Sequence, residues 1–172
     1  MKTIVINSKK YGKHEIFVDD EDFERVNQYK WHLIKPKNSK NNYAGSNIYL
    51  GNGKQKPITL HRFIMNVTDP KIHIDHIFHN GLDCQKKNLR TCNRSQNGAN
   101  RTKNINSKSK YLGVYLSIDK RNDKTYSYWR AQLNINGKRT HIGSFKNELD
   151  AAKAYDKYAI KHYGDFANIN FK

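Results

Sequence analysis

The residues with the clearest potential for chemistry lie between positions 75 and 97 of the 172-residue chain. An adjacent Asp75-His76 pair is followed by Asn88 and then by Asn97. Carboxylate and amide oxygens suit a hard divalent cation, and a histidine can take a proton from water. This set of residue types favours a hydrolytic site with one metal ion.

Within this set, His76 is the candidate general base, because the unperturbed pKa of histidine lies close to neutral pH. Asp75 and Asn97 could hold one Mg²⁺ or Mn²⁺ ion through oxygen. Asn88 would hold the strand or loop so that His76 points at the attacking water. The arrangement therefore predicts two metal ligands, one base and one brace.

Two cysteines, Cys84 and Cys92, leave an alternative open. They could share a zinc ion with His76 or His79, but structural zinc sites need four ligands and usually pair them at short spacing. We favour free thiols in a reducing compartment. The N-terminal segment lacks the apolar core of a signal peptide and no long apolar run follows, so we expect a cytoplasmic, intracellular protein that does not bind a membrane.

Charge indicates a polyanionic partner. The formal net charge is +17, from 32 Lys and Arg against 15 Asp and Glu, and basic groups that neutralise phosphates release condensed counterions. Between Asp83 and Asp119 there are eight basic residues and no acidic one. From this stretch we expect DNA contacts by Arg90, Arg94, Arg101, Lys103, Lys108 and Lys110.

Three segments must position these residues, and together they predict an α+β fold. Residues 1–71 read as mixed strands, at 4–6, 15–18, 31–34 and 47–50, with short helices opening at 19–22 and 60–65. Residues 72–101 read as strand, loop, strand and helix. Residues 102–108 are polar and basic, which is typical of a linker.

The last segment predicts three strands and one helix. The strands cover 111–117, 126–135 and 138–145, with a tight turn at Asn136-Gly137. An amphipathic helix is expected over 147–163, and its predicted inner face carries Leu149, Ala152, Tyr155, Ala159 and His162. Trp129, Phe145 and Tyr155 are expected in the core between sheet and helix.

The central residues resemble the HNH nuclease motif of the ββα-metal fold, in the form found in phage and intron-encoded homing endonucleases. Asp75-His76, Asn88 and Asn97 carry the resemblance, and Asn97 stands where other members have histidine. The family implies His76 as base, Asp75 and Asn97 as metal ligands, and Asn88 as a brace. The segments 60–62 and 81–83 match the surrounding family pattern, and Cys84 replaces the usual Asn.

The tail resembles the DNA-binding domain of the APETALA2/ethylene-response-factor type over residues 109–171. The matching segments are 109–114, 129–133, 141–145, 151–156 and 167–171. The resemblance implies a sheet in the major groove, read by Tyr115, Ser117, Arg130, Gln132, Asn134, Arg139 and His141. Tyr115, Ser117 and Asn134 replace arginines of the plant pattern and His141 replaces tryptophan, so a GC-rich site is not implied; Gln132 and Asn134 would suit adenine.

These features lead to three domain predictions and one function. Residues 1–101 would form the N-terminal strands and the nuclease domain, 102–108 the basic linker, and 109–172 the DNA-binding domain. We expect a site-specific, metal-dependent endonuclease of the homing type that acts on double-stranded DNA as a monomer and nicks one strand. A DNA-binding regulator with a vestigial nuclease motif is the alternative; a restriction enzyme or a nonspecific nuclease is a weaker one.

Overall fold

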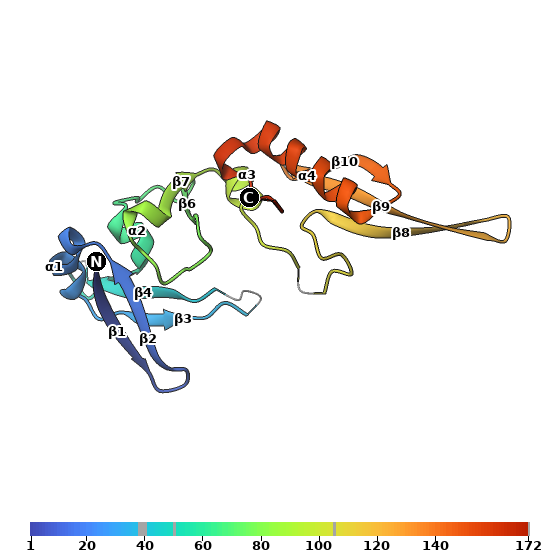
Figure 1. Cartoon of the computed structure of the whole chain (residues 1–172). Helices are drawn as coiled ribbons and strands as arrows, with labels where there is room; N and C mark the ends of the chain where they lie inside the picture. Colours follow the sequence, from blue (N-terminus) through green and yellow to red (C-terminus); the bar gives the residue numbers. More distant parts are fainter. Residues whose placement is uncertain (38–40, 50, 105, 172) are drawn as a thin grey trace. The chain divides into compact units, whose positions relative to one another are not determined.

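The structure is a computed structural model that describes residues 1–37, 41–49, 51–104 and 106–171. The chain divides into two compact units, Met1–Cys92 and Asn93–Lys172 (Figure 1). Each unit combines short helices with small antiparallel sheets, so the predicted α+β class is confirmed. No helix in the described ranges is both long and apolar enough to cross a membrane.

The first unit opens with a hairpin of β1 (Lys2–Ser8) and β2 (Gly12–Val18). Gly12, the first residue of β2 after the turn of this hairpin, has a φ of +79°, a backbone conformation that favours glycine. Helix α1 (Asp20–Asn27) follows, and the acidic residues of its first turn lie at the positive end of the helix dipole.

A three-stranded antiparallel sheet follows, with the order β3 (His32–Ile34), β4 (Tyr43–Tyr49) and β5 (Gln55–Thr59). The sequence did not predict β5, which contains Pro57. Proline lacks the N–H that a central strand needs, and β5 tolerates it because it lies at the edge of the sheet. Residue 50, the predicted end of a strand, lies outside the described residues.

Helix α2 (Leu60–Ile64) leads to the two-stranded sheet of β6 (His73–His76) and β7 (Leu89–Cys92), with the short 3₁₀ helix η1 (Lys86–Asn88) between them. One core joins all of these elements. It buries Ile6, Ile16, Val18, Val26, Trp31, Ala44, Leu60, Ile64, Cys84 and Leu89.

The first hairpin holds the loop between β6 and β7 directly. Phe17 N–H donates to Leu82 O at 3.0 Å, and Cys84 N–H donates to Phe17 O at 2.9 Å. Asp19 Oδ2 accepts from the backbone N–H of Lys86 at 2.8 Å. The N-terminal strands therefore form one packed body with the β6–β7 sheet.

The second unit begins with helix α3 (Arg94–Ala99), which is capped by a reciprocal pair of hydrogen bonds between Asn93 and Gln96. Ser95 Oγ lies 2.9 Å from Tyr163 Oη, and Asn168 N–H donates to Ala99 O at 3.2 Å. The compact-unit boundary thus falls at Cys92/Asn93, whereas the sequence places a domain boundary after residue 101. The reason is that α3 packs with the C-terminal elements.

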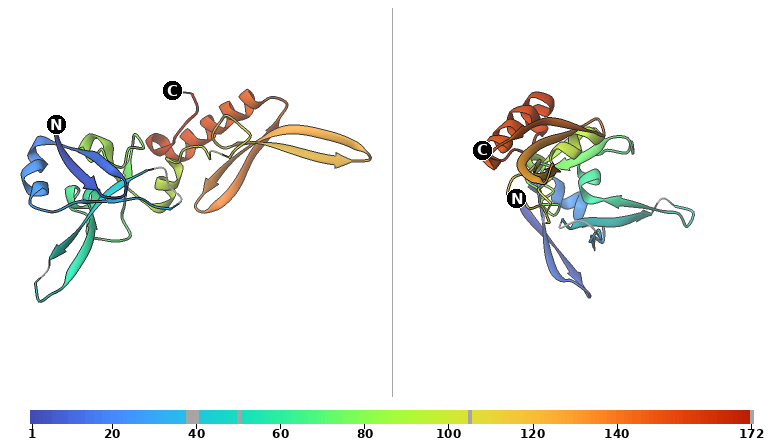
Figure 2. Two further views of the ribbon diagram at one scale, coloured as in Figure 1. Left: turned by 90° about the horizontal axis from the view of Figure 1, so that it is seen from below. Right: turned by 90° about the vertical axis from the view of Figure 1, so that its right-hand side faces the viewer.

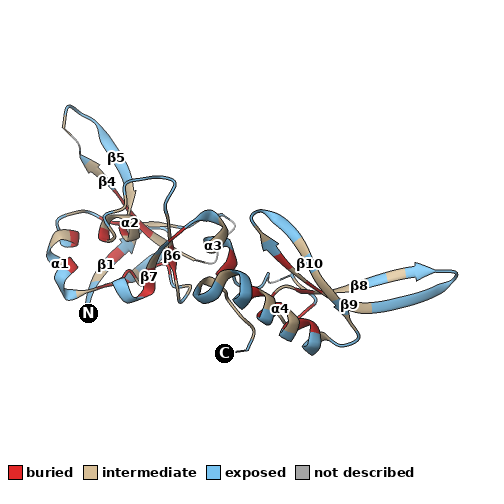
Figure 3. Cartoon of the chain, turned by 90° about the horizontal axis from the view of Figure 1, so that it is seen from above, coloured by how far each residue is buried: buried red, intermediate tan, exposed pale blue. Residues whose placement is uncertain are grey.

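The C-terminal sheet has the order β10 (Lys138–Phe145), β9 (Lys124–Ile135) and β8 (Val114–Arg121). Helix α4 (Glu148–Tyr163) covers one face, followed by the 3₁₀ helix η2 (Gly164–Phe166) (Figure 3). The shared core buries Tyr155, and Trp129 and Phe145 pack against it, as predicted.

The predicted inner face of α4 is wrong at both ends. Leu149 is 42% exposed and His162 is also exposed, while Ala151, Ala152, Tyr155 and Ala159 are buried. Alanine side chains bring the helix close to the sheet, so the small residues of α4 define its inner face.

Strands β8 and β9 extend further than predicted, to a turn at Asn122 and Asp123. Both turn residues have positive φ, 47° and 59°, as a two-residue hairpin turn requires. The pair continues as a two-stranded ribbon beyond the region where β9 pairs with β10 (Figure 2).

Candidate active site and nucleic-acid interface

Asp75 and His76 stand at the end of β6, opposite Arg90 and Leu89 of β7. Both side chains are largely buried, with exposed fractions of 6% for Asp75 and 7% for His76. The Arg90 guanidinium donates to Asp75 Oδ2 from Nε at 2.9 Å and from Nη2 at 2.7 Å. Arg90 therefore neutralises the Asp75 carboxylate across the ladder, and its predicted contact with DNA phosphate stays a prediction.

Asn88 ties together both ends of the loop between β6 and β7. Its Oδ1 accepts from Phe78 N–H at 2.8 Å, and its Nδ2 donates to Asp83 O at 2.8 Å. Its backbone carbonyl also accepts from Ile77 N–H at 2.9 Å. The fully buried Asn88 side chain thus fixes the residues that directly follow His76, the arrangement that the HNH resemblance implies for a brace.

Replacement of Asn88 by alanine is expected to destabilise the first unit by about 3 kcal/mol, because it removes the hydrogen bonds of a fully buried side chain to Phe78 N–H and Asp83 O. Chemical denaturation measures this loss. Asn7→Ala, on the exposed side of β1, is the matched control. A loss within about 0.5 kcal/mol of that control would contradict the bracing role.

The His76 imidazole lies in an aromatic cluster with Tyr43 and His61. The ring centroids of His61 and His76 are 5.1 Å apart and nearly perpendicular, and that of Tyr43 lies 5.7 Å from His76 and 5.9 Å from His61. Thr59 Oγ1 lies within hydrogen-bond distance of His61 Nε2, at 3.0 Å. His61 therefore packs against the candidate base.

Gly81 allows this cluster to form. A Cβ atom at residue 81 would lie 2.3 Å from the backbone carbonyl of Asn42 and 2.8 Å from the ring of Tyr43. Both distances are too short for any real contact, so only glycine lets the loop press Tyr43 toward His76. Tyr43 was not predicted as part of the site, because its role depends on this approach of β4 to the loop.

Burial sets the ionisation of both histidines. It lowers the pKa of His76 to about 4, even though Asp75 and Asp83 act to raise it. It also lowers the pKa of His61 to about 3, with the neighbouring His76 and Arg62 adding to the effect. At neutral pH both imidazoles are therefore neutral, which leaves His76 able to accept a proton.

The His61 pKa gives a prediction for stability. The unfolded chain binds a proton at residue 61 below pH 6.5 and the folded chain only near pH 3, so the free energy of unfolding should fall as pH drops through this window, by up to ~1.4 kcal/mol per pH unit. His61→Phe keeps an aromatic ring and removes this contribution. Denaturation at pH 7, 6 and 5 should give a shallower pH slope in the variant; equal slopes would refute the burial of a neutral His61.

The candidate metal ligands come from both compact units. Asp75 belongs to the first, and Asn97 lies on the exposed side of α3 in the second. Their oxygen donors fit Mg²⁺ or Mn²⁺, and Asp75 offers a buried carboxylate that already attracts a cation, the Arg90 guanidinium. The pairing of Asp75 with Asn97 stays a prediction.

The cysteines do not support the zinc alternative. Cys84 and Cys92 are buried free thiols, and burial raises their pKa to about 12 and about 11. Cys84 Sγ lies 4.0 Å from His76 Nε2. Among the described residues, no three His, Cys, Asp or Glu side chains form a group that could hold a metal ion.

The register of the C-terminal sheet places the predicted reading residues on one surface. Ala131 and Leu133 of β9 are buried against α4, so the alternate residues of this strand face away from the helix. Cross-strand pairing puts the other predicted readers on the same face. This reading face, as we call it, comprises Tyr115, Ser117, Arg130, Gln132, Asn134, Arg139 and His141.

A chain of polar contacts orders the middle of the reading face. Arg130 Nη2 donates to Tyr128 Oη, which in turn donates to Asp119 Oδ2 at 2.6 Å. Hydrogen bonds to Tyr115 and Tyr128 raise the pKa of Arg130, so the guanidinium stays charged. Tyr128 and Asp119 were not predicted to act here, although they share the face by strand alternation.

The remaining basic residues of the acid-free stretch are solvent-exposed. Lys103 Nζ donates to Ser109 O at 3.0 Å, and Lys110 Nζ lies 5.2 Å from the centroid of the Tyr111 ring. Among them, the residues predicted to contact DNA are Arg94, Arg101, Lys103, Lys108 and Lys110. Their positive charges are thus available to a polyanion, and their contacts with DNA stay a prediction.

Comparison with known proteins supports the nuclease interpretation. The chain is 29% identical over 159 residues to a protein of Acanthamoeba polyphaga mimivirus named as an uncharacterized HNH endonuclease. The alignment covers 90% of this chain and 73% of the viral protein. No family model matches the chain, and no solved structure matches it. The similarity supports an HNH nuclease family.

Proposed function

We propose that this protein is a site-specific, metal-dependent DNA endonuclease of the HNH homing type. The observation that carries the proposal is the buried Asp75-His76 pair at the end of β6. Asn88 holds the loop that follows this pair, and burial lowers the pKa of His76 so that its imidazole is neutral at neutral pH. The similarity to a viral HNH endonuclease extends over nearly the whole chain and supports the same activity.

In this mechanism the neutral His76 accepts a proton from the attacking water. The rings of Tyr43 and His61 pack against the His76 imidazole and hold it in place. Asp75 and Asn97 would hold the divalent cation, which, when bound, stabilises negative charge on the phosphate oxygens. Within the described residues Asp75 and His76 form one such pair, so we expect a monomer to nick one strand.

The reading face would bind the major groove, where a sheet fits and base edges are distinguishable. The exposed basic residues between 94 and 110 would contact the backbone. Together the nuclease site and the reading face predict one long, asymmetric target site.

The regulator alternative has one observation in its favour. The Asp75 carboxylate is paired with Arg90, so a cation that binds Asp75 must share the carboxylate with the guanidinium or displace it. A protein that bound DNA tightly but never cut it, with any divalent metal, would be explained by this pair.

A cleavage assay separates the two functions. The protein is incubated with supercoiled plasmid or genomic DNA in the presence of Mg²⁺ or Mn²⁺, and with EDTA as the metal-free control. We expect relaxed circles only when metal is present, with ends that map to a defined site. DNA that is bound in a mobility-shift assay but left intact in every metal would favour the regulator.

DNA binding should also weaken steeply with salt. If about six phosphates are neutralised, the association constant should fall by roughly 10³-fold between 50 and 200 mM salt. Fluorescence anisotropy on a labelled duplex measures the slope. A flat salt response would refute the electrostatic contribution of the basic residues.

A further inference from the structure

The β8–β9 ribbon of the second unit is longer than the three-stranded sheet requires. Strand β10 pairs with β9 only over residues 129–135, whereas β8 and β9 pair out to Arg121 and Lys124 (Figure 2). Every residue from 120 to 127 is exposed (Figure 3), and the ribbon leaves Ile118 and Tyr126 more than half exposed. A two-stranded hairpin alone is marginally stable at best, so core packing does not explain this length.

Local contacts order the ribbon at its two ends. The tight turn at Asn122 and Asp123 joins the strands at the tip. At the base, Asp119 Oδ2 accepts from Tyr128 Oη at 2.6 Å and lies 3.7 Å from Arg121 Nη2. Residues 118–128 carry three basic side chains against two acidic ones, and Asp119 is one of those two. The positive charge of the tip is therefore opposed mainly by Asp123.

The strand register places the tip charges on the reading face. Arg121 lies directly opposite Lys124 in the ladder, and residues directly opposite in an antiparallel pair share a face. Lys124 and Tyr126 are an even number of residues from Arg130 on the same strand, so they share its face as well. The reading face thus continues along the ribbon, while Lys120 lies on the opposite side.

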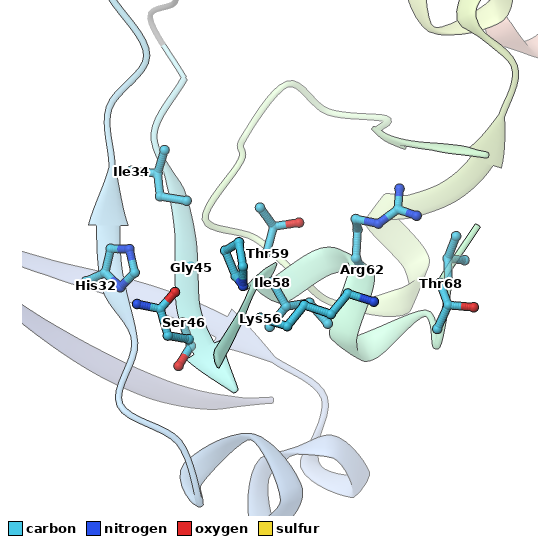
Figure 4. Close-up of a pocket in the computed structure, with 12 residues that line it drawn as sticks. His32, Ile34, Gly45, Ser46, Lys56, Ile58, Thr59, Arg62 and Thr68 are labelled. Carbon is cyan, nitrogen blue, oxygen red and sulfur yellow. The ribbon is translucent and has the colours of Figure 1, made fainter. Parts of the chain in front are cut away.

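A pocket in the first unit lacks such a shared face. It lies on the β3–β5 sheet beside α2 and has a volume of about 230 Å³ (Figure 4). The register puts Ile34 and Asn47 on one face of that sheet and Lys56 and Ile58 on the other. These side chains do not converge on one ligand, whereas the charges of the ribbon tip do share one surface.

The reach of the ribbon matches the dimensions of DNA. Lys124 is six residues from Arg130 on β9, a span of about 20 Å at about 3.4 Å per residue. The major groove is about 12 Å wide, and half a helical turn is about 17 Å long. With Arg130 at the base edges, the tip would therefore reach past the groove to the phosphates at its rim.

We propose that the tip of the β8–β9 ribbon binds phosphates of the DNA backbone beside the bases that the reading face contacts, an inference that rests on the proposed DNA binding. Arg121 and Lys124 supply the positive charge, and the Tyr126 hydroxyl donates to a phosphate oxygen. Phosphate contacts release counterions and carry no sequence information directly. The tip therefore adds affinity and fixes the register of the sheet on the duplex.

The first test is the salt dependence of binding, measured by fluorescence anisotropy with the full-length protein in EDTA. The duplex carries a site selected from random DNA. Arg121→Gln combined with Lys124→Gln should reduce the slope of log affinity against log salt by about 1.8, and affinity at 150 mM salt roughly tenfold or more. Lys124→Gln alone should reduce the slope by about 0.9. Lys120→Gln, the same charge change on the opposite face, should leave the slope unchanged.

The second test is a hydroxyl-radical footprint on the same duplex. Wild type should protect backbone positions roughly six base pairs from the bases contacted by Arg130, since about 20 Å corresponds to that many steps of about 3.4 Å. The double variant should lose this outer protection and keep the rest of the footprint. Lys120→Gln should keep both parts.

Two results would overturn the proposal: a double variant with the wild-type slope and footprint, or a Lys120→Gln variant that loses as much as Lys124→Gln. Because these measurements need no cleavage, they separate the ribbon from the nuclease. Site-specific cleavage with an unchanged footprint in the double variant removes the ribbon contact and leaves the nuclease. Binding that depends on the ribbon, without cleavage in any metal, removes the nuclease. A wild-type protein that binds no DNA removes both.

Discussion

His76→Ala is expected to lower the rate constant for DNA cleavage by roughly 10²–10⁴-fold, the contribution typical of a positioned general base. DNA affinity should stay within about twofold of wild type, because the buried imidazole offers little surface to the duplex. Single-turnover cleavage and anisotropy measure the two quantities on one substrate.

The same substitution at His73 provides a matched control. His73 lies on the same strand but faces Cys92 in the ladder, on the opposite side from His76. His73→Ala should cleave at a rate within about threefold of wild type. If His76→Ala cleaves within tenfold of wild type while folded, His76 is not the base, and the neutral imidazole among Tyr43, His61 and Cys84 serves packing only.

Local features of the sequence predicted much of this fold, and their success has a physical basis. The Asn136-Gly137 turn is present with φ of 49° and 80°, because these two residue types tolerate the left-handed backbone that a tight hairpin needs. Trp129, Phe145 and Tyr155 pack in the C-terminal core, as large aromatic residues in a small domain should.

The errors arose where tertiary contacts outweigh local pattern. Strand β5 escaped prediction because its sequence is polar and contains Pro57, and only pairing with β4 makes it a strand. The face of α4 was misplaced because Leu149 is more hydrophobic than the alanines that lie against the sheet. The β8–β9 ribbon was predicted too short because Asn122-Asp123 lacks the glycine of a typical turn.

The candidate site shows the same division. Asp75, His76 and Asn88 could be selected from residue type and spacing, since β6, β7 and η1 keep them within one short segment. The support of His76 by Tyr43 and His61 could not, because it requires β4 and α2 to meet a loop about 20 to 40 residues away in sequence. Gly81 is present in the sequence, but the reason that this position requires glycine, its close approach to Asn42 and Tyr43, appears only in the structure.

Substitutions on the reading face should abolish discrimination between DNA sequences while leaving general affinity for DNA. Arg130→Ala and Gln132→Ala each remove a side chain that points away from α4 and could pair with base edges. A good base contact contributes about 1–3 kcal/mol, so each variant should lose roughly 5- to 150-fold in specific binding. Each variant should lose discrimination at a different base pair of the target site, so that the contributions of Arg130 and Gln132 to specific binding can be measured separately.

The experiment uses a duplex that carries the mapped cleavage site or a site selected from random DNA, with a scrambled duplex for reference. Lys153→Ala, on the exposed side of α4, removes a positive charge from the opposite face of the domain and is the control. Lys153→Ala should lower the affinity for both duplexes equally or leave both affinities unchanged. If Arg130→Ala and Gln132→Ala also lower the affinity for both duplexes equally, the sheet contacts only the DNA backbone. The DNA sequence must then be read by another part of the chain.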